Sequence, residues 1–203
     1  MITIVDYGMG NLASVANAIK KYTKDVRISS KAVDVGKTDK LVLPGVGAFK
    51  DAYDEIEKRN LRKPVLDFIA SGKPFLGICL GLQLLFTKSY EDGEHPGFDI
   101  IKGEVVAFDK AKGLKVPHMG WNRISQDKNK DCPLLKGVVG GAYMYFVHSY
   151  YVAPQDSSVV LTTTDYGLDF CSMAWKDNIY AMQFHPEKSQ EEGLKIIKNF
   201  VEL

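Results

Sequence analysis

A cysteine between two glycines stands where an apolar run gives way to a helix-like stretch, and this junction limits the possible folds more than any other feature. The run Phe75–Ile78 indicates a buried strand, and Leu80–Phe86 has the apolar content of a buried helix. Gly77 and Gly81 allow a sharp turn in which the flanking chains pass too close for side chains. The helix would point its unpaired N–H groups at the Cys79 sulfur, which favours the thiolate. The pattern predicts a nucleophile on top of a parallel sheet.

A histidine and a glutamate near the end of the chain could supply the base for this nucleophile. In an extended segment, His185 and Glu187 fall on the same side, so the carboxylate can orient the imidazole. Pro186 between them biases His185 to extended geometry. Alone, such a segment is more often a turn than a site, and a buried cysteine is often only a small hydrophobe.

A third segment changes the balance between these interpretations. Pro44-Gly45-Val46-Gly47 follows the strand-like run Lys40–Leu43, and its two glycines free the backbone to aim N–H groups at an anion. Together the three segments favour a catalytic triad of Cys79, His185 and Glu187. The N–H groups of Gly45, Val46, Gly47 and Leu80 are the candidates to stabilise an oxyanion.

These motifs resemble the class I, or triad, glutamine amidotransferases, which combine P-G-V-G, G-x-C-x-G-x-Q and a terminal H-P-E. More narrowly, the chain is similar to the glutaminase subunits of imidazole glycerol phosphate synthase from histidine biosynthesis. The turn motif around Cys79, called the nucleophile elbow, fits many amidotransferases by itself, whereas H-M-G-W-N and Y-F-V-H-S-Y are more specific. The resemblance covers the whole chain in order, through Asp6–Leu12, Pro44–Phe49, Gly77–Phe86, Pro117–Asn122, Tyr145–Tyr150 and Gln183–Ser189.

The resemblance implies further roles for residues of this chain. The amino-acid end of glutamine would be bound by Gln83, His148, Ser149 and Tyr150; the less favoured alternative for Gln83 is a helix-surface residue. A (β/α)₈-barrel cyclase subunit would receive the ammonia and form a heterodimer with this chain. The residues expected to face that partner are Asn11, His118, Trp121, Asn122, Tyr145 and Lys188. From the residues alone, Asn11 reads as a helix cap, Trp121 fits a core anchor as well as an interface, and His118 a structural histidine.

The order of apolar patterns predicts an α/β fold. In the first half, short apolar runs alternate with helical patterns, which is typical of a parallel sheet with crossover helices. In the second half, the strand-like runs Glu104–Phe108, Tyr143–Val152, Val159–Thr164, Cys171–Trp175 and Tyr180–Phe184 suggest added antiparallel strands. Ser189 and Glu192 form a capping-box pattern before a last helix. We therefore expect a mixed, largely parallel central sheet with flanking helices, as in class I amidotransferases and flavodoxin-like folds.

Composition excludes several other classes of protein. A chain of 203 residues is expected to form a single domain over 1–203, and its net charge of +1 argues against a general nucleic-acid surface. No apolar run approaches a membrane span, so we expect a soluble, cytoplasmic protein. The four histidines lack metal-ligand spacing and no phosphate-binding glycine motif is present, so neither a metal nor a cofactor is expected.

Three other functions remain open at this level. The chain could be a glutaminase subunit that feeds a different synthase, such as a surface-sugar amidotransferase. A free-standing cysteine hydrolase could share the elbow, although Pro44–Gly47 with the terminal His-Pro-Glu argues against it. A non-catalytic scaffold is disfavoured because no triad member is missing.

Overall fold

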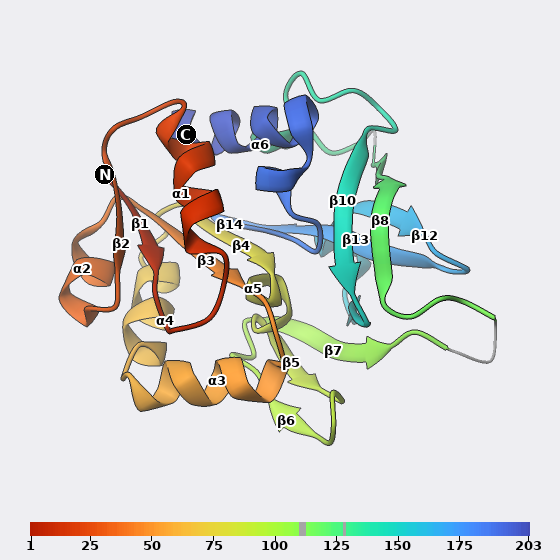
Figure 1. The fold of residues 1–203 in the computed structure, drawn as a ribbon, viewed down its shortest axis with the longest axis horizontal. Coiled ribbons are helices and arrows are strands. Elements are labelled where there is room, and N and C mark those ends of the chain that lie inside the picture. Colours follow the sequence, from red (N-terminus) through yellow and green to blue (C-terminus); the bar gives the residue numbers. More distant parts are fainter. Residues whose placement is uncertain (110–112, 128) are drawn as a thin grey trace.

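The computed structural model describes residues 1–109, 113–127 and 129–203 and shows helices on both faces of a long mixed sheet (Figure 1). The helices are α1 Leu12–Lys20, α2 Ala32–Lys37, α3 Phe49–Lys58, α4 Arg62–Ala70, α5 Leu80–Gln83 and α6 Gln190–Glu202. The first strands are β1 Ile2–Val5, β2 Val26–Ser29, β3 Lys40–Gly45, β4 Phe75–Cys79, β5 Phe86–Ser89, β6 His95–Pro96 and β7 Ile101–Ala107. The later strands are β8 His118–Arg123, β9 Ser125–Gln126, β10 Tyr143–His148, β11 Tyr150–Pro154, β12 Val160–Asp165, β13 Asp169–Lys176 and β14 Ile179–Met182.

The parallel part of the sheet runs β2-β1-β3-β4-β14, and its side chains alternate between two apolar layers. On β3, Leu41 and Leu43 pack with the cluster under α2, α3 and α4, whereas Val42 packs with the cluster under α1 and α6. Since successive side chains of a strand point to opposite faces, an apolar run of this kind needs helices on both sides. The two layers bury β1, β3, β4 and β14 almost completely, whereas the edge strand β2 stays partly exposed.

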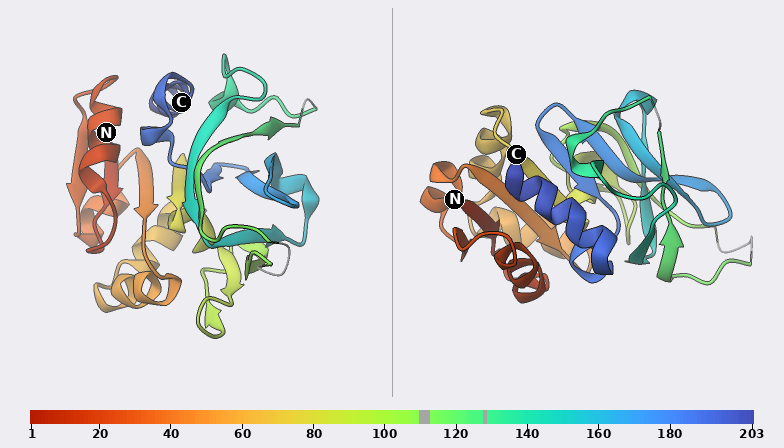
Figure 2. Two further views of the ribbon diagram at one scale, coloured as in Figure 1. Left: turned by 45° about the vertical axis from the view of Figure 1, so that its right-hand side comes forward. Right: turned by 90° about the horizontal axis from the view of Figure 1, so that it is seen from above.

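The rest of the main sheet continues from β14 through β13, β11, β7, β5 and β6, with β12 and β9 paired beside β13. In the order β14, β13, β11 and β7, each strand is antiparallel to the next. Strands β8 and β10 form a separate antiparallel pair that curves beside β12 and β13 (Figure 2). The predicted fold class is confirmed: a parallel half is extended by antiparallel strands.

Two predicted elements have different limits. The helix expected over Leu80–Phe86 is a single turn, α5, because the buried run after Gln83 bends into β5 instead of continuing as a helix. The strand expected over Tyr143–Val152 is two strands in different sheets, separated at Ser149. Unbroken apolar runs did not reveal either break, since packing against different partners decides both.

The predicted capping box at Ser189 is wrong. The Ser189 hydroxyl donates to the His185 carbonyl at 2.6 Å and accepts from the Tyr145 N–H at 2.9 Å. Glu192 instead accepts from the Val139 N–H. Ser189 is buried, and its hydroxyl therefore ties the start of α6 to β10 rather than to its own helix. Helix α2 and strands β5, β6, β8 and β9 were also not predicted, being short or rich in polar residues and glycine.

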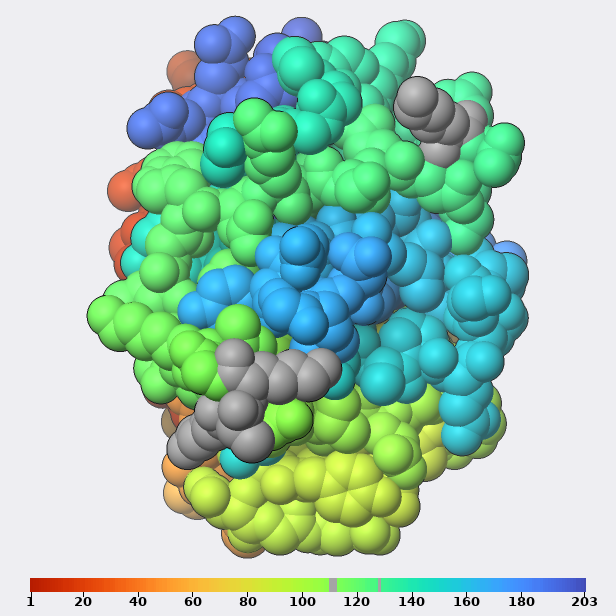
Figure 3. Space-filling model, turned by 90° about the vertical axis from the view of Figure 1, so that its right-hand side faces the viewer, coloured from red at the N-terminus to blue at the C-terminus, as the bar shows by residue number. Residues whose placement is uncertain are grey.

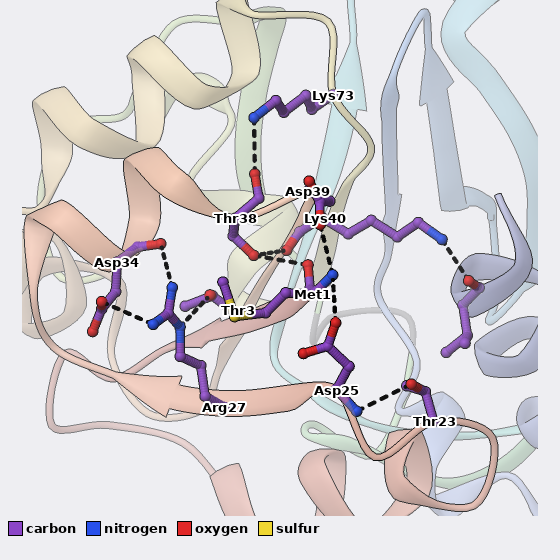
Figure 4. Close-up of polar contacts among 11 residues, drawn as sticks. Met1, Thr3, Thr23, Asp25, Arg27, Asp34, Thr38, Asp39, Lys40 and Lys73 are labelled. Carbon is purple, nitrogen blue, oxygen red and sulfur yellow. Dashed lines mark hydrogen bonds and ion pairs between the residues drawn. The ribbon is translucent and has the colours of Figure 1, made fainter.

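The amino-terminal edge of the sheet is held by polar contacts (Figure 4). The Met1 ammonium contacts Asp25 at 2.9 Å and Asp39 at 2.6 Å, and Arg27 pairs with Asp34 at 3.0 Å. The Lys40 ammonium donates to the Val201 carbonyl and so connects β3 to the end of α6. Exposed pairs contribute little free energy individually, and their effect here is to align strand ends.

On the side where β8, β10 and β12 lie, the β12–β13 hairpin occupies the middle of the surface (Figure 3). In the described ranges, none of the helices combines the length and the apolar character that a membrane crossing requires.

Two glycine substitutions should change stability in opposite directions. A Cβ at Gly81 would lie 1.9 Å from the Leu43 carbonyl oxygen, so Gly81→Ala must push β3 and α5 apart. We expect it to lower the free energy of unfolding by about 1–3 kcal/mol or more. Gly36 lies in α2 with no atom within 4 Å of its Cβ position, so Gly36→Ala should raise it by about 0.5–1 kcal/mol. Urea unfolding of both variants checks the pair; equal effects would contradict the packing argument.

Candidate active site

Cys79 stands at the corner between β4 and α5 in a strained backbone conformation. Its φ is 54° and its ψ is −106°, in the left-handed range that non-glycine residues rarely adopt. The turn is possible because Gly77 and Gly81 are bare: a Cβ at Gly77 would approach the Gly81 carbonyl to 2.8 Å. The sequence prediction of a tight elbow is thus confirmed, with one turn of helix following it.

His185 and Glu187 lie beside this corner because β14 pairs with β4 in parallel. His185 Nδ1 contacts Glu187 Oε1 at 2.8 Å, and the two side chains are only 3% and 1% exposed. The predicted contact is confirmed, although Glu187 belongs to a 3-10 turn, Pro186–Lys188, rather than to an extended segment. Proline is suited to the first position of such a turn, because that position needs no N–H donor.

The ionisation of His185 is set by these neighbours. Burial by itself lowers the pKa of the imidazole, but the adjacent Cys79 and Glu187 outweigh it and raise the pKa to about 10. The other ring nitrogen, Nε2, is buried and makes no hydrogen bond within the described ranges. An imidazolium held between a sulfur and a carboxylate is suited to giving a proton to a leaving group.

The predicted oxyanion strand runs next to the nucleophile. Gly45 is paired in register with Cys79 across β3 and β4. A Cβ at Gly45 would lie 2.3 Å from the Tyr7 hydroxyl and 2.8 Å from Leu80 Cβ, so the site requires glycine. Val46 and Gly47 follow on the exposed side, and Gly47 has a φ of +97°. Leu80 opens α5, where backbone N–H groups lack helical partners.

A pocket of about 230 Å³ opens over the Cys79 sulfur. Its walls include eight residues predicted from the sequence, namely Val46, Gly47, Cys79, Leu80, Gln83, His148, Ser149 and Tyr150. Gln83 is buried, which excludes the helix-surface alternative. Its amide nitrogen donates to the Tyr150 carbonyl at 3.1 Å and to Gln183 Oε1 at 3.0 Å, so its own oxygen remains available.

Two polar side chains at the site were missed by the sequence analysis. Glu91 lines the pocket, half-buried, and accepts from the Phe49 N–H at 2.7 Å; burial raises the pKa of its carboxyl. Gln183 is fully buried, and its amide donates to the Cys79 sulfur at 3.5 Å. Glu91 lies in a polar turn that looks like solvated surface, and Gln183 was noted only as part of a motif.

Comparison with known proteins agrees with this geometry. The family model for class I glutamine amidotransferases matches residues 3–203.

The chain belongs to the class I glutamine amidotransferase family.

Curated relatives in this family are similar over nearly the whole chain. The chain is 53% identical to the imidazole glycerol phosphate synthase subunit HisH of Syntrophotalea carbinolica, covering 98% of each. It is 52% identical to the subunit of the same name from Aquifex aeolicus, covering 97% of this chain and 94% of the relative. Among solved structures, one titled glutamine amidotransferase matches with a TM-score of 0.76 at 16% identity, over all of both chains. PurLQS from Thermotoga maritima matches at 0.75 and 14% identity, over 99% and 97%.

An exposed aromatic surface lies on the β8–β10 pair of this amidotransferase. Trp121 is 46% exposed and stands across the ladder from Tyr145, whose ring also lies under the Lys188 ammonium. The Tyr145 carbonyl accepts from the His185 N–H at 2.9 Å, so this surface adjoins His185 directly. Asn11 is exposed and caps α1 by accepting from the Ser14 N–H, as predicted.

His118 does not lie on that surface. It is 3% exposed and stacks between Phe146 and Tyr166, with ring centroids 4.8 Å and 4.0 Å away. Side chains on β8 alternate between its two faces, so His118, three residues before Trp121, points to the face opposite Trp121. Asn122 is half-buried and donates to the Asp165 carbonyl at 2.9 Å.

The remaining cysteines of the amidotransferase differ from Cys79. Burial raises the pKa of Cys132 to about 11 and of Cys171 to about 12, so both stay protonated thiols at neutral pH. Among the described residues, no group of three His, Cys, Asp or Glu side chains is arranged to hold a metal ion.

Histidine titration should separate the catalytic residue from its neighbours. Burial lowers the pKa of His118 to about 4 and of His148 to about 3, whereas that of His185 rises to about 10 from an ordinary value of 6.5. At pH 7.5, ¹⁵N NMR should show His185 doubly protonated and the other two neutral. Cys79→Ala and Glu187→Gln should each lower the His185 pKa. A neutral His185 at pH 7.5 would contradict this assignment.

The same shift affects stability with a defined sign. Because the folded chain binds the His185 proton more tightly than the unfolded chain, this contribution is complete below about pH 6.5 and is lost as pH rises through about 10.

Proposed function

We propose that this chain is the glutaminase subunit of an imidazole glycerol phosphate synthase, hydrolysing glutamine to glutamate and ammonia. The observation that carries the proposal is the buried Cys79–His185–Glu187 arrangement, whose Cys79 lines an amino-acid-sized pocket. Relatives that are about half identical over nearly the full length bear that subunit's name. Their similarity supports the histidine-pathway assignment.

The first half of the reaction forms a thioester. The Cys79 sulfur attacks the side-chain amide carbon of glutamine, and N–H groups of Leu80 and the Gly45–Gly47 strand stabilise the oxyanion. The imidazolium of His185 then gives its proton to the departing nitrogen, which leaves as ammonia. Glu187 holds the ring through Nδ1, so that Nε2 is the nitrogen that transfers the proton.

The second half releases glutamate. His185, now neutral, takes a proton from a water molecule as that water attacks the thioester carbon. The carbon–sulfur bond breaks, Cys79 regains its thiolate, and the imidazolium is restored. No other acid or base is needed, because one histidine serves both steps in turn.

The pocket offers matching groups for the amino-acid end of glutamine. The Glu91 carboxylate and the free oxygen of Gln83 are acceptors for an α-ammonium group. The Ser149 and Tyr150 segment forms the opposite wall and supplies backbone and hydroxyl groups. This combination favours a free amino acid over a peptide, whose backbone nitrogen carries no charge.

The ammonia would be delivered to a partner subunit. In bulk water ammonia becomes protonated and stops being a nucleophile, so a synthase that covers the site preserves it. We assign the docking surface to Trp121, Tyr145, Lys188 and Asn11, with a (β/α)₈-barrel cyclase as the partner that converts PRFAR to imidazole glycerol phosphate and AICAR. Exposed tryptophan and tyrosine are typical anchors of such interfaces.

Cys79→Ala should abolish glutamine-dependent synthesis by the complex with the cyclase subunit and leave synthesis from added ammonium salt intact. The alanine removes the sulfur that forms the thioester but leaves the partner's chemistry unchanged. Parallel turnover assays with the two nitrogen sources measure this. As controls, Cys132→Ala and Cys171→Ala should retain both activities. Glutamine-dependent turnover in Cys79→Ala would refute the assignment of the nucleophile. A complex that uses ammonium but forms no imidazole glycerol phosphate would point to another synthase.

Glutamine hydrolysis should depend on the partner. Gly45 and Gly47 flank Val46, so the oxyanion strand has the conformational freedom to change when a subunit docks beside it. The isolated chain should hydrolyse glutamine slowly, and the cyclase subunit with a nucleotide ligand should raise kcat by orders of magnitude with little change in KM. Trp121→Ala should weaken this activation and spare the fold, as circular dichroism can show. Equal rates for the free chain and the complex would instead support a free-standing hydrolase.

A further inference from the structure

A chain of hydrogen bonds runs from strand β8 to the wall of the pocket. Asn122 Nδ2 lies 3.3 Å from His118 Nε2, and His118 Nδ1 lies 2.9 Å from His148 Nε2. His148 Nδ1 in turn lies 2.8 Å from the Tyr150 carbonyl oxygen. Both histidines are buried, and both pocket-wall residues, His148 and Tyr150, border the space over Cys79.

The two ends of the chain fix the proton positions between them. A carbonyl oxygen only accepts, so His148 must carry its proton on Nδ1 and accept at Nε2. His118 must therefore donate from Nδ1 and accept at Nε2, where the amide of Asn122 supplies the donor. Each neutral ring therefore has one tautomer that satisfies every contact, and in all three hydrogen bonds the donor hydrogen is directed toward the pocket side of the chain.

The chain continues from Tyr150 to the nucleophile. The Tyr150 carbonyl also accepts from Gln83 Nε2, whose second hydrogen goes to Gln183 Oε1, and Gln183 Nε2 donates to the Cys79 sulfur. Both hydrogens of the Gln83 amide are thus engaged, which leaves its oxygen available to a ligand in the pocket. A shift of the Tyr150 carbonyl would turn the Gln83 amide and so displace this acceptor oxygen.

These hydrogen bonds do not form a proton-transfer path. The outer end of the chain is an amide and its inner end a carbonyl, and neither exchanges a proton near neutral pH. Burial lowers the pKa of both histidines, and the nearby His185 lowers that of His148 further, so the rings stay neutral. The rings are also held by stacking of His118 between Phe146 and Tyr166.

We propose that Asn122 and His118 are positioning residues of the glutaminase site, which act through His148 to hold the Tyr150 carbonyl and, through it, Gln83 in the orientation that binds glutamine. This inference rests on the proposed function. The inference gives the buried His118 a role in the protein interior. It gives Asn122 a role that is separate from any contact with a partner.

The first test replaces His118 by Phe, which preserves the ring stack and removes both hydrogen bonds. In the complex with the cyclase subunit, we expect kcat/KM for glutamine to fall roughly 10- to 100-fold, mainly through KM, since a buried acceptor on His148 is left unpaired. Alkylation of Cys79 by iodoacetamide, which does not use the amino-acid pocket, should keep its rate. Ammonium-dependent synthesis should also be unchanged. His118→Gln, which can both donate and accept, should recover part of the loss.

The second test reads the protons directly. In wild-type protein, ¹⁵N NMR should show His118 and His148 both protonated on Nδ1. Asn122→Asp turns the outer donor into an acceptor, so His118 should gain a proton on Nε2 and KM for glutamine should rise. Asn60→Asp, an exposed change in the connection between α3 and α4, is the matched control and should alter neither.

The outcomes separate the two levels of the proposal. Unchanged KM in His118→Phe and Asn122→Asp, or an Nε2 proton on either ring of the wild type, overturns the positioning role and leaves the glutaminase assignment standing. Equal losses of hydrolysis, iodoacetamide reactivity and thermal stability in His118→Phe would show a structural role only. A wild-type complex that uses ammonium but does not hydrolyse glutamine refutes the proposed function and this inference together.

Discussion

The rest of the site depends on the close approach of three backbone segments around Cys79. Strand β3, strand β4 and helix α5 meet with so little space that a Cβ at Gly45, Gly77 or Gly81 would overlap a neighbouring atom. This contact forces Cys79 into a positive φ and lifts its sulfur from the sheet into the pocket. The strain is held by the buried sheet on either side, which has two apolar layers to resist distortion.

Parallel pairing then brings the other two members of the proposed triad to the same edge. Strand β14 lies next to β4, so its carboxyl end delivers His185 beside Cys79, and the turn after it delivers Glu187. The carbonyl of Tyr145 and the hydroxyl of Ser189 fix the backbone around His185. The exposed β8–β10 surface is therefore connected to His185 by a main-chain hydrogen bond, which on the proposed function is a short route for a docked subunit to affect the reaction.

Three buried histidines near this site show how the surroundings set charge. His185 has a sulfur and a carboxylate beside it, and its pKa rises despite burial. His118 and His148 have only each other, an amide and a carbonyl, and their pKa values fall. Burial removes water from the charged form of all three rings, but only His185 has partners, Cys79 and Glu187, whose attraction for the imidazolium offsets that loss. The contrast suits one histidine to acid–base chemistry and two to fixed hydrogen bonds.

The tight turn at Cys79, the His185–Glu187 contact and the mixed α/β fold all follow from the sequence alone, because glycine placement and apolar runs act over a few residues. The sequence did not determine that α5 is a single turn, that Tyr143–Val152 divides between two sheets, or that Ser189 bonds to β10 instead of capping its helix. Nor does the sequence contain a sign that Glu91 reaches the pocket or that Gln183 contacts the sulfur. Each of these depends on groups far apart in the chain, and only tertiary packing decides which of them meet.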